Sequence, residues 1–438
     1  YHWQERYPIA TYLVSVAIHP YTVFYDWYKY SPTDSMRLEY YVFPENYNAV
    51  QANYGLTKNM IGTFAQKYGE YPFINEKYGH AEFVWGGGME HQTLTSLGGH
   101  SESLIAHELG HQWWGDMVTC ANFHHIWLNE GFAEYGESIW YEAEYGVERM
   151  QNDMISKQYF GAGTIFVEDT TSVGSIFHGG LSYAKASWVL HMLRHIVGDS
   201  AFFAGLQEYG NRYRFKSAVT EQFRDVMEDV SGKDLNSFFQ RWIYGEFYPI
   251  YNVTYDFNSD SLYVLIEQTQ DSEVFEMPVD IKATFTDNSE QLWVIENSQR
   301  KELFTLDLAD NTEIINIEID PDNWILNKIE NITKDDNLDT TSSKNVPEEF
   351  HLYPVYPNPF NVGVTIRFAI ENEGKVRLNV FDINGNRVWH KSAKFAAGTH
   401  LINWNGKNQF GDNVPTGAYF VEVGFGSQIN IRKMLLLK

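Results

Sequence analysis

Two histidines and a glutamate occur in the arrangement His107-Glu108-Leu109-Gly110-His111. If this segment is helical, the two histidines lie one turn apart on the same face, and both imidazoles can reach one metal ion. Glu108 then lies beside the metal, where it can act as a general base without being a ligand. The spacing therefore predicts a metal centre, with zinc as the expected ion.

A third ligand is expected because catalytic zinc sites commonly use three protein ligands and leave the fourth position to water. Glu130 follows His111 after eighteen intervening residues. This separation is long enough for one helix to end and for a second helix to return a carboxylate to the metal. We predict one zinc ion per chain, bound by His107, His111 and Glu130.

The spacing of the motif also has simpler explanations, since a pair of histidines four residues apart can lie on a surface or in an ordinary core. Leu104-Ile105-Ala106 precedes the motif and Trp113-Trp114 follows it, so the helix is expected to be buried. Buried histidines and a buried glutamate need polar partners. A metal ion supplies such a partner, which favours the metal centre.

The overall charge limits the classes of partner. The chain has 438 residues, with 32 basic and 57 acidic side chains and a formal net charge of -25. Such a charge argues against binding to nucleic acid and to anionic membrane surfaces. No transmembrane segment is expected, because the longest apolar run, Pro8 to Ile18, is too short and contains polar residues.

The single cysteine, Cys120, excludes an intrachain disulfide and is expected to be a small buried residue. The sequence begins with Tyr1 rather than methionine and has no signal peptide. We therefore expect that a segment upstream of Tyr1 belongs to the natural protein.

Changes in residue pattern predict five segments in a multidomain α+β chain. Residues 1–22 are expected to be a strand left from an N-terminal β domain, and residues 23–249 to be a mostly helical catalytic domain. Residues 250–330 are expected to form a small antiparallel β-sandwich. The polar residues 331–349 have the composition of a linker, and residues 350–438 are expected to form a second all-β domain.

Local patterns predict individual elements. Ile9 to Ile18 is rich in β-branched and aromatic residues and favours a strand, whereas residues 45–70 and 101–145 favour helices. Six short strands are expected between residues 250 and 329. Asn384-Gly385 predicts a hairpin turn.

Glu90 follows a run of glycines, Gly86 to Gly88, and Met89. A strand at this place could pair with an extended peptide, and Glu90 could bind its amine. From these residues alone, however, a glycine bulge with a surface glutamate is favoured. Two further questions stay open, because 29 tyrosines prevent the choice of an oxyanion-stabilising hydroxyl and Glu134 could support a histidine or lie on the surface.

Residues 1 to about 249 resemble the M1 family of gluzincin metallopeptidases, the group of aminopeptidase N and leukotriene A4 hydrolase. The resemblance implies a thermolysin-like catalytic domain in which Glu90 binds a free α-amine, Tyr183 stabilises the oxyanion, and Gly87, Gly88 and Met89 line the substrate cleft. The motifs that carry it are Gly87-Gly88-Met89-Glu90-His91, His107 to His111 with Gln112-Trp113-Trp114-Gly115-Asp116, Asn129-Glu130-Gly131-Phe132-Ala133, Tyr183-x-Lys185-Ala186, and the stretch from Phe238 to Pro249.

The sequence departs from this family at several points. His91 stands where the family motif usually has asparagine, which leaves the role of that side chain open. Most of the family's N-terminal β domain and its large C-terminal helical domain are absent from these residues. A more open cleft is expected as a result.

Residues 350–438 resemble the C-terminal sorting domain of the type IX secretion system, which has an Ig-like fold. The resemblance implies export from a Bacteroidetes-like Gram-negative bacterium, either as a secreted protein or on the cell surface. The motifs that carry it are Tyr356-Pro357-Asn358-Pro359-Phe360, Gly398-Thr399-His400, Trp404-Asn405-Gly406, Thr416-Gly417-Ala418-Tyr419-Phe420 and the segment from Arg432 to Lys438.

Together these observations predict a secreted zinc aminopeptidase that removes N-terminal residues from peptides. An epoxide hydrolase resembling leukotriene A4 hydrolase, an endopeptidase and a non-catalytic surface adhesin are the alternatives. The sequence does not indicate the preferred N-terminal side chain, the physiological substrate or the oligomeric state.

Overall fold

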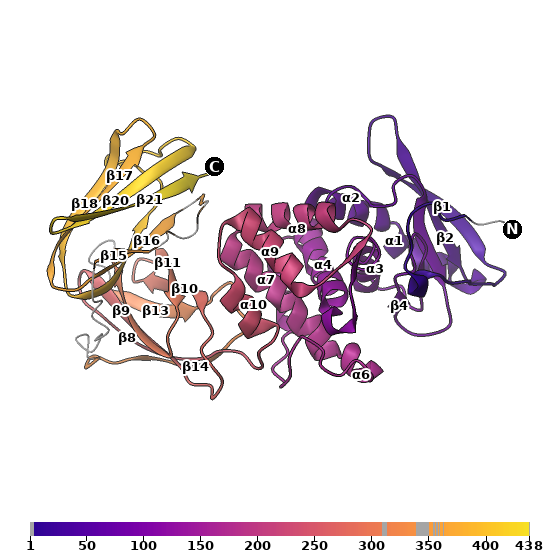
Figure 1. Cartoon of the computed structure of the whole chain (residues 1–438), viewed down its shortest axis with the longest axis horizontal. Coiled ribbons are helices and arrows are strands. Elements are labelled where there is room, and N and C mark those ends of the chain that lie inside the picture. Colours follow the sequence, from indigo (N-terminus) through magenta and orange to yellow (C-terminus); the bar gives the residue numbers. More distant parts are fainter. Residues whose placement is uncertain are drawn as a thin grey trace. The chain divides into compact units, whose positions relative to one another are not determined.

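The computed structural model describes residues 4–308, 313–338 and 350–437, except 354, 356, 357, 359 and 362. The chain forms two compact units, Tyr1–Phe247 and Tyr248–Lys438. The first unit combines a β-sheet with a group of helices, and the second is built from strands (Figure 1). The α+β class expected from the sequence is confirmed in this form.

A five-stranded sheet lies in the N-terminal half of the first unit (Figure 1). Its order is β1-β2-β3-β5-β4, with β2, β3 and β5 parallel to one another. The short strand β4 pairs antiparallel with β5 at one edge of the sheet. An edge strand leaves backbone groups available to an extended peptide. The bounds are β1 (Thr22–Lys29), β2 (Ser35–Val42), β3 (Lys77–Glu82), β4 (Gly88–Met89) and β5 (Thr95–Leu97).

The helices that carry the predicted metal ligands are α3 (Glu102–Gly110) and α4 (Trp127–Tyr145), within the segment expected to be helical. Most of their residues are buried, and α3 begins where the Ser101 hydroxyl accepts a hydrogen bond from the backbone N–H of Leu104 (3.3 Å). The remaining helices of the unit are α1 (Tyr47–Tyr54), α2 (Thr57–Tyr68), α5 (Val147–Ser156), α6 (Val173–Ile176), α7 (Ala186–Val197), α8 (Asp199–Tyr213), α9 (Thr220–Ser231) and α10 (Asn236–Trp242).

Shorter elements connect these helices. A π-helical turn, η4 (Gly179–Lys185), leads directly into α7, and three 3₁₀ turns are η1 (Thr11–Leu13), η2 (Pro44–Asn46) and η3 (Phe123–His125). Strands β6 (Val118–Cys120) and β7 (Lys216–Ala218) form a small parallel pair.

The strand predicted for Ile9 to Ile18 is wrong. This segment contains only the 3₁₀ turn η1, and Val14, Val16 and Ile18 are 63%, 80% and 90% exposed. A β-branched run becomes a strand only where another strand pairs with it, and the edge strand β1 pairs with β2 instead. The assignment of residues 1–22 to a β domain stays a prediction.

The second unit contains the six strands expected between residues 250 and 329 and the hairpin expected at Asn384-Gly385, where Gly385 has φ of +80°. The bounds are β8 (Ile250–Phe257), β9 (Ser261–Gln268), β10 (Met277–Phe285), β11 (Glu290–Asn297), β12 (Lys301–Asp307), β13 (Ile314–Ile319), β14 (Lys328–Lys334), β15 (His351–Leu352), β16 (Val364–Ile370), β17 (Gly374–Asp382), β18 (Arg387–Phe395), β19 (Gly398–Trp404), β20 (Gly417–Phe425) and β21 (Gln428–Leu436).

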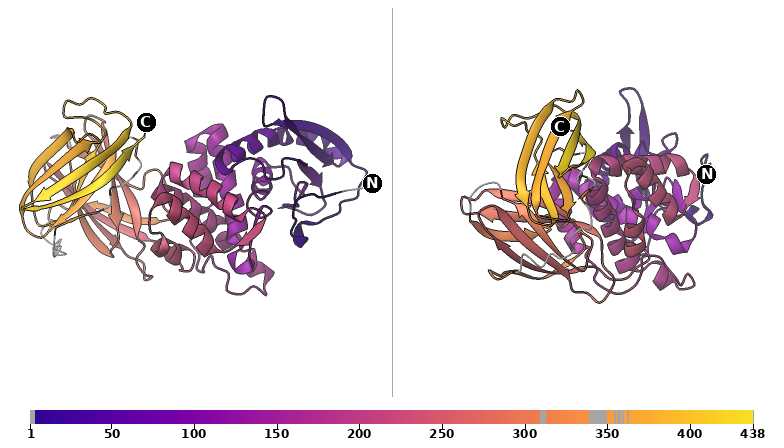
Figure 2. Two further views of the ribbon diagram at one scale, coloured as in Figure 1. Left: turned by 45° about the horizontal axis from the view of Figure 1, so that its top comes forward. Right: turned by 60° about the vertical axis from the view of Figure 1, so that its left-hand side comes forward.

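These strands form three sheets, with the orders β11-β10-β13, β14-β8-β9-β12-β19-β16-β15 and β18-β17-β20-β21. The last of these is a fully antiparallel layer, visible as the yellow strands in Figure 2. The seven-stranded sheet is mixed, because β14 pairs parallel with β8 and β12 pairs parallel with β19. Purely antiparallel sheets were expected for both sandwiches. The two parallel pairs show that this prediction is wrong for the seven-stranded sheet.

The division of the second unit into a sandwich at 250–330 and an Ig-like domain at 350–438 stays a prediction. Nineteen buried side chains between Phe350 and Leu436 form a separate hydrophobic core, yet strands from both ranges share the seven-stranded sheet. Residues 331–334, expected to be linker, complete β14. Residues 339–349 of the expected linker lie outside the described residues, as do Tyr356, Pro357, Pro359 and Lys438 of the sorting motifs.

Among the described residues, no helix has the length and apolar character needed to cross a membrane.

Candidate metal centre and substrate cleft

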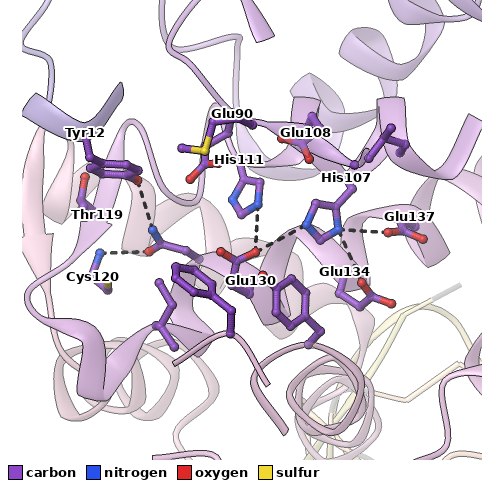
Figure 3. A pocket seen from close by; sticks show the side chains of 18 of the residues that line it. Tyr12, Glu90, His107, Glu108, His111, Thr119, Cys120, Glu130, Glu134 and Glu137 are labelled. Carbon is purple, nitrogen blue, oxygen red and sulfur yellow. Dashed lines mark hydrogen bonds and ion pairs between the residues drawn. The ribbon is translucent and has the colours of Figure 1, made fainter. Parts of the chain in front are cut away.

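The three predicted metal ligands converge at the facing ends of two helices (Figure 3). His107 lies in the last turn of α3 and His111 follows its end, while Glu130 lies in the first turn of α4. Oε2 of Glu130 is 3.5 Å from Nε2 of His107 and 3.2 Å from Nε2 of His111. All three residues are buried.

This arrangement fits a zinc ion. Bonds of about 2.0–2.1 Å in a tetrahedral shell place neighbouring ligand atoms roughly 3.3 Å apart. The Nε2 atoms and the Glu130 carboxylate lie 3.2 and 3.5 Å apart. The donor set of two imidazoles and one carboxylate also matches the chemistry of a catalytic zinc site.

The two imidazoles are oriented through their other ring nitrogens. Nδ1 of His111 lies 3.0 Å from the carbonyl oxygen of Trp114, to which it can donate. Nδ1 of His107 lies 3.0 Å from Oε1 of Glu137 and 3.5 Å from Oε2 of Glu134. Such partners turn Nε2 of each ring toward the metal position. Glu134 thus lies beside His107 rather than on an open surface. No pattern in the sequence had indicated Glu137.

The pKa values of Glu130 and His111 both shift in the direction that favours the charged form of the side chain. Burial raises the pKa of Glu130, but the imidazoles of His111 and His107 outweigh burial and lower it to about 2. Burial lowers the pKa of His111, yet the carboxylates of Glu90 and Glu130 raise it to about 9. The protein therefore concentrates negative charge around its histidines, which favours a cation.

Glu108 lies on α3 between the two histidines and lines the cleft. Burial raises the pKa of its carboxyl to about 8. Its Oε2 is buried and has no hydrogen-bond partner among the described residues. An unsatisfied buried oxygen is costly unless a bound species contacts it, so this atom is available to a water or substrate.

Glu90 is 7% exposed and lines the same cleft, which excludes the surface position that the glycine-rich stretch alone favoured. Its carboxylate, that of Glu108 and a ring nitrogen of His111 have ligand atoms within 4.8 Å of one another. The backbone oxygen of Glu90 accepts a hydrogen bond from Nε2 of Gln112 (3.2 Å), the residue after His111. This contact fixes the backbone of Glu90 relative to the segment that carries His111.

Tyr183 belongs to the π-helical turn η4, and its ring stacks on that of His107 with a centroid separation of 5.9 Å. Gly131 on α4 allows the following helix α7 to approach, because an added Cβ there would lie 2.5 Å from Cβ of Ala186. Burial raises the pKa of the Tyr183 hydroxyl, which keeps it protonated and able to donate.

The cleft around these residues has a volume of about 980 Å³. Gly87, Gly88 and Met89 form part of its lining, as expected. Five glutamates and no lysine or arginine are found among its described lining residues: Glu90, Glu108, Glu130, Glu134 and Glu137. The walls are therefore suited to a cationic or neutral ligand.

Tyr12 also lines the cleft, although sequence reasoning placed its segment outside the catalytic domain. Its hydroxyl accepts a hydrogen bond from Nδ2 of Asn129 and donates one to the carbonyl oxygen of Gly115, both at 3.4 Å. No spacing rule could have connected Tyr12 with residues more than a hundred positions away.

Two family models match the chain. Residues 89–242 match the model described as "Peptidase family M1 domain", and residues 354–437 match the "Secretion system C-terminal sorting domain". Residues 89–242 are thus similar to the peptidase domain of family M1, a family of metallopeptidases, and residues 354–437 are similar to a secretion sorting domain. Both resemblances inferred from the sequence are confirmed.

Two curated relatives are similar to parts of this chain. Aminopeptidase N of Lactococcus lactis subsp. cremoris is 33% identical over 171 residues, which cover 36% of this chain and 20% of that relative. Glutamyl aminopeptidase of Sus scrofa is 25% identical over 353 residues, covering 73% of this chain and 37% of that relative.

The crystal structure of Legionella pneumophila aminopeptidase A in complex with aspartic acid shows a similar fold, with a TM-score of 0.64 and 16% sequence identity. The match covers 71% of this chain and 38% of the Legionella chain. This chain therefore spans from a fifth to somewhat more than a third of the length of these proteins.

Proposed function

We propose that the protein is a secreted, zinc-dependent aminopeptidase that removes single residues from the free N-terminus of peptides. The observation that carries this proposal is the position of Glu90, a buried carboxylate whose oxygen lies within 4.8 Å of both Glu108 and the ring nitrogen of His111. A carboxylate so close to the reaction centre favours a substrate that brings a positive charge, as an α-ammonium group does.

In the proposed reaction, His107, His111 and Glu130 hold one zinc ion. When bound, zinc supplies Lewis acidity toward a water molecule and the scissile carbonyl group. Glu108 accepts a proton from the attacking water and transfers it to the leaving nitrogen as the carbon–nitrogen bond breaks. The Tyr183 hydroxyl donates a hydrogen bond to the oxygen on which negative charge develops.

Glu90 anchors the α-ammonium group and so determines which bond is cleaved. With the amine fixed at Glu90, only the first peptide bond reaches Glu108 and the zinc ligands. A peptide whose amine is acetylated leaves the Glu90 carboxylate buried without a partner, which is unfavourable.

The test uses two peptides of the same sequence, one with a free N-terminus and one acetylated, and the full-length protein. Single N-terminal residues should be released from the free peptide only, and a zinc chelator should stop the reaction until zinc is restored. Internal cleavage of both peptides would replace this proposal with an endopeptidase. Absence of any cleavage by the zinc-loaded protein would favour the epoxide hydrolase or the adhesin.

The proposed location follows from the sorting domain at residues 354–437. We expect it to engage the type IX secretion machinery and to direct the peptidase to the medium or the cell surface of a Bacteroidetes-like bacterium. Deletion of residues 350–438 should leave the peptidase inside the cells of a host with that machinery.

A further inference from the structure

Lys157 is a buried cation that the proposed reaction does not use. It follows the last residue of α5 (Val147–Ser156), and its side chain is 8% exposed. Its Nζ lies 2.9 Å from Oδ2 of Asp153, 3.2 Å from Oε2 of Glu137 and 3.5 Å from Oε1 of Glu134. It also donates a hydrogen bond to the backbone oxygen of Glu134 (2.8 Å).

Two of these carboxylates bridge the lysine to a metal ligand. Glu137 directs Oε2 to Lys157 and Oε1 to Nδ1 of His107, which is 3.0 Å away. Glu134 directs Oε1 to Lys157 and Oε2 to the same Nδ1, at 3.5 Å. Each carboxylate thus uses one oxygen for the cation and the other for the histidine.

We infer that Lys157 is a positioning residue of the metal centre, which holds Glu134 and Glu137 against His107 and thereby sets the affinity for the metal. The inference rests on the metal centre of the proposed function. It connects the end of a third helix, α5, with the two helices that position the ligands.

The physical reason is the repulsion among buried carboxylates. Without the ammonium group, Glu134, Glu137 and Asp153 lose their shared cation in a region where their side chains are only 17%, 11% and 9% exposed. Carboxylate oxygens of Glu134 and Glu137 lie within 4.8 Å of one another, and like charges at such a separation repel strongly in a medium of low polarity. Asp153 is itself fixed by a hydrogen bond from the Ser138 hydroxyl (2.7 Å), so the two glutamates are the groups able to turn away.

A purely structural role for Lys157 makes a different prediction. In that case the lysine only attaches α5 to α4, and its loss lowers the stability of the protein without changing the metal centre. Zinc affinity and the ligand geometry around the bound metal distinguish the two roles, whereas stability and peptide turnover do not.

The experiment compares the full chain with its Lys157→Met and Lys157→Arg variants. Zinc affinity is measured by competition with a chromophoric chelator, and the visible absorption spectrum of the cobalt-substituted protein reports the ligand geometry. Lys157→Met should bind zinc roughly 10- to 100-fold more weakly, the range found when outer partners of metal ligands are removed. Lys157→Arg keeps the charge and should recover most of the affinity.

Arg194→Met provides a matched control. Arg194 is also a buried cation that reaches α4, where it forms an ion pair with Glu142 (2.7 Å), and its side chain is 3% exposed. Its removal should lower stability and leave both zinc affinity and the cobalt spectrum unchanged.

If Lys157→Met does not fold, the double variant Lys157→Met with Asp153→Asn removes one positive and one negative charge together. It should fold and still bind zinc more weakly than the natural protein. Unchanged zinc affinity and an unchanged cobalt spectrum in either folded variant would overturn the inference. A natural protein that binds zinc but cleaves no peptide would refute only the proposed function, whereas one that binds no zinc would refute both.

Discussion

Two buried histidines of the first unit show how differently the same side chain can be accommodated. His107 lies on α3 and contacts carboxylates of α4, with Glu130 on one ring nitrogen and Glu134 and Glu137 on the other. His80 lies in β3 and is surrounded by the rings of Tyr40, Tyr54 and Tyr78, with centroid separations of 5.3, 4.6 and 5.4 Å. Neither nitrogen of His80 has a hydrogen-bond partner among the described residues.

The difference appears in the direction of the pKa shifts. Burial lowers the pKa of His80 to about 3. Burial also lowers the pKa of His107, but the carboxylates of Glu130, Glu134 and Glu137 outweigh it and raise the pKa well above its usual value. Burial alone therefore does not distinguish the proposed metal ligand His107 from His80, whereas the carboxylates beside both ring nitrogens of His107 do.

The largest expected difference between the surroundings of His107 and His80 is in the zinc content of the corresponding variants. His107→Ala should lose zinc and reduce peptide cleavage by more than about a thousandfold, because several kcal/mol of transition-state stabilisation disappear with the metal. His80→Phe should keep both zinc and activity. Zinc analysis of the purified proteins and initial rates test the pair, and loss of zinc from His80→Phe would break the comparison.

Glu108→Gln tests the proposed base without changing the proposed metal ligands around it. The rate should fall by about 10²- to 10⁴-fold while zinc is retained, since the amide cannot accept the proton of water. Glu102→Gln on the same helix is a suitable control, because that carboxylate contacts Tyr145 instead of the cleft. A rate for Glu108→Gln equal to that of the control would remove Glu108 as the base.

Glu90→Ala tests whether a carboxylate near the zinc ligands selects the free amine. A charge-assisted hydrogen bond contributes about 1.5–3 kcal/mol, so kcat/KM for a free peptide should fall roughly 10- to 150-fold. Slow cleavage of the acetylated peptide should not decrease. An equal loss for both peptides would mean that Glu90 acts on the metal centre rather than on the amine.

His80→Phe should stabilise the protein, because it replaces an unpartnered buried polar ring. We expect a gain of about 1–3 kcal/mol in the free energy of unfolding near neutral pH. Below pH 6.5 the unfolded state binds a proton at His80, while the folded state does not until about pH 3. The natural protein therefore loses stability relative to the variant as the pH falls through this window.

Urea unfolding at pH 7.5 and pH 5.5 measures this effect. The advantage of the variant should grow by about 1 kcal/mol between the two conditions. A constant difference would show that His80 titrates in the folded protein with the same pKa as in the unfolded state.

The smallest effect concerns the N-terminal side chain of the substrate. Because five glutamates and no described lysine or arginine line the cleft, peptides that begin with an acidic residue should be cleaved several-fold more slowly than neutral ones. Matched substrates that begin with leucine and glutamate test this. Faster cleavage of the glutamate substrate would show that a cation reaches the cleft from elsewhere.

Local patterns were reliable where the interactions are close in sequence. The helices over 45–70 and 101–145 and the strands between 250 and 329 were predicted from periodicity and turn residues. The segment from Ile9 to Ile18 was mispredicted, because its β-branched residues lack a pairing strand.

By itself, the sequence determined which residues we propose as metal ligands: the spacing of His107 and His111 corresponds to one helical turn, and Glu130 is the carboxylate that a second helix can return. Only the tertiary structure decided that Glu90 is buried, that Glu137 supports His107 and that Lys157 and Tyr12 lie near the same centre. These residues come from separate elements, and their proximity depends on how α3, α4, α5 and the sheet pack together. That packing depends on contacts across the whole unit, which no local spacing records.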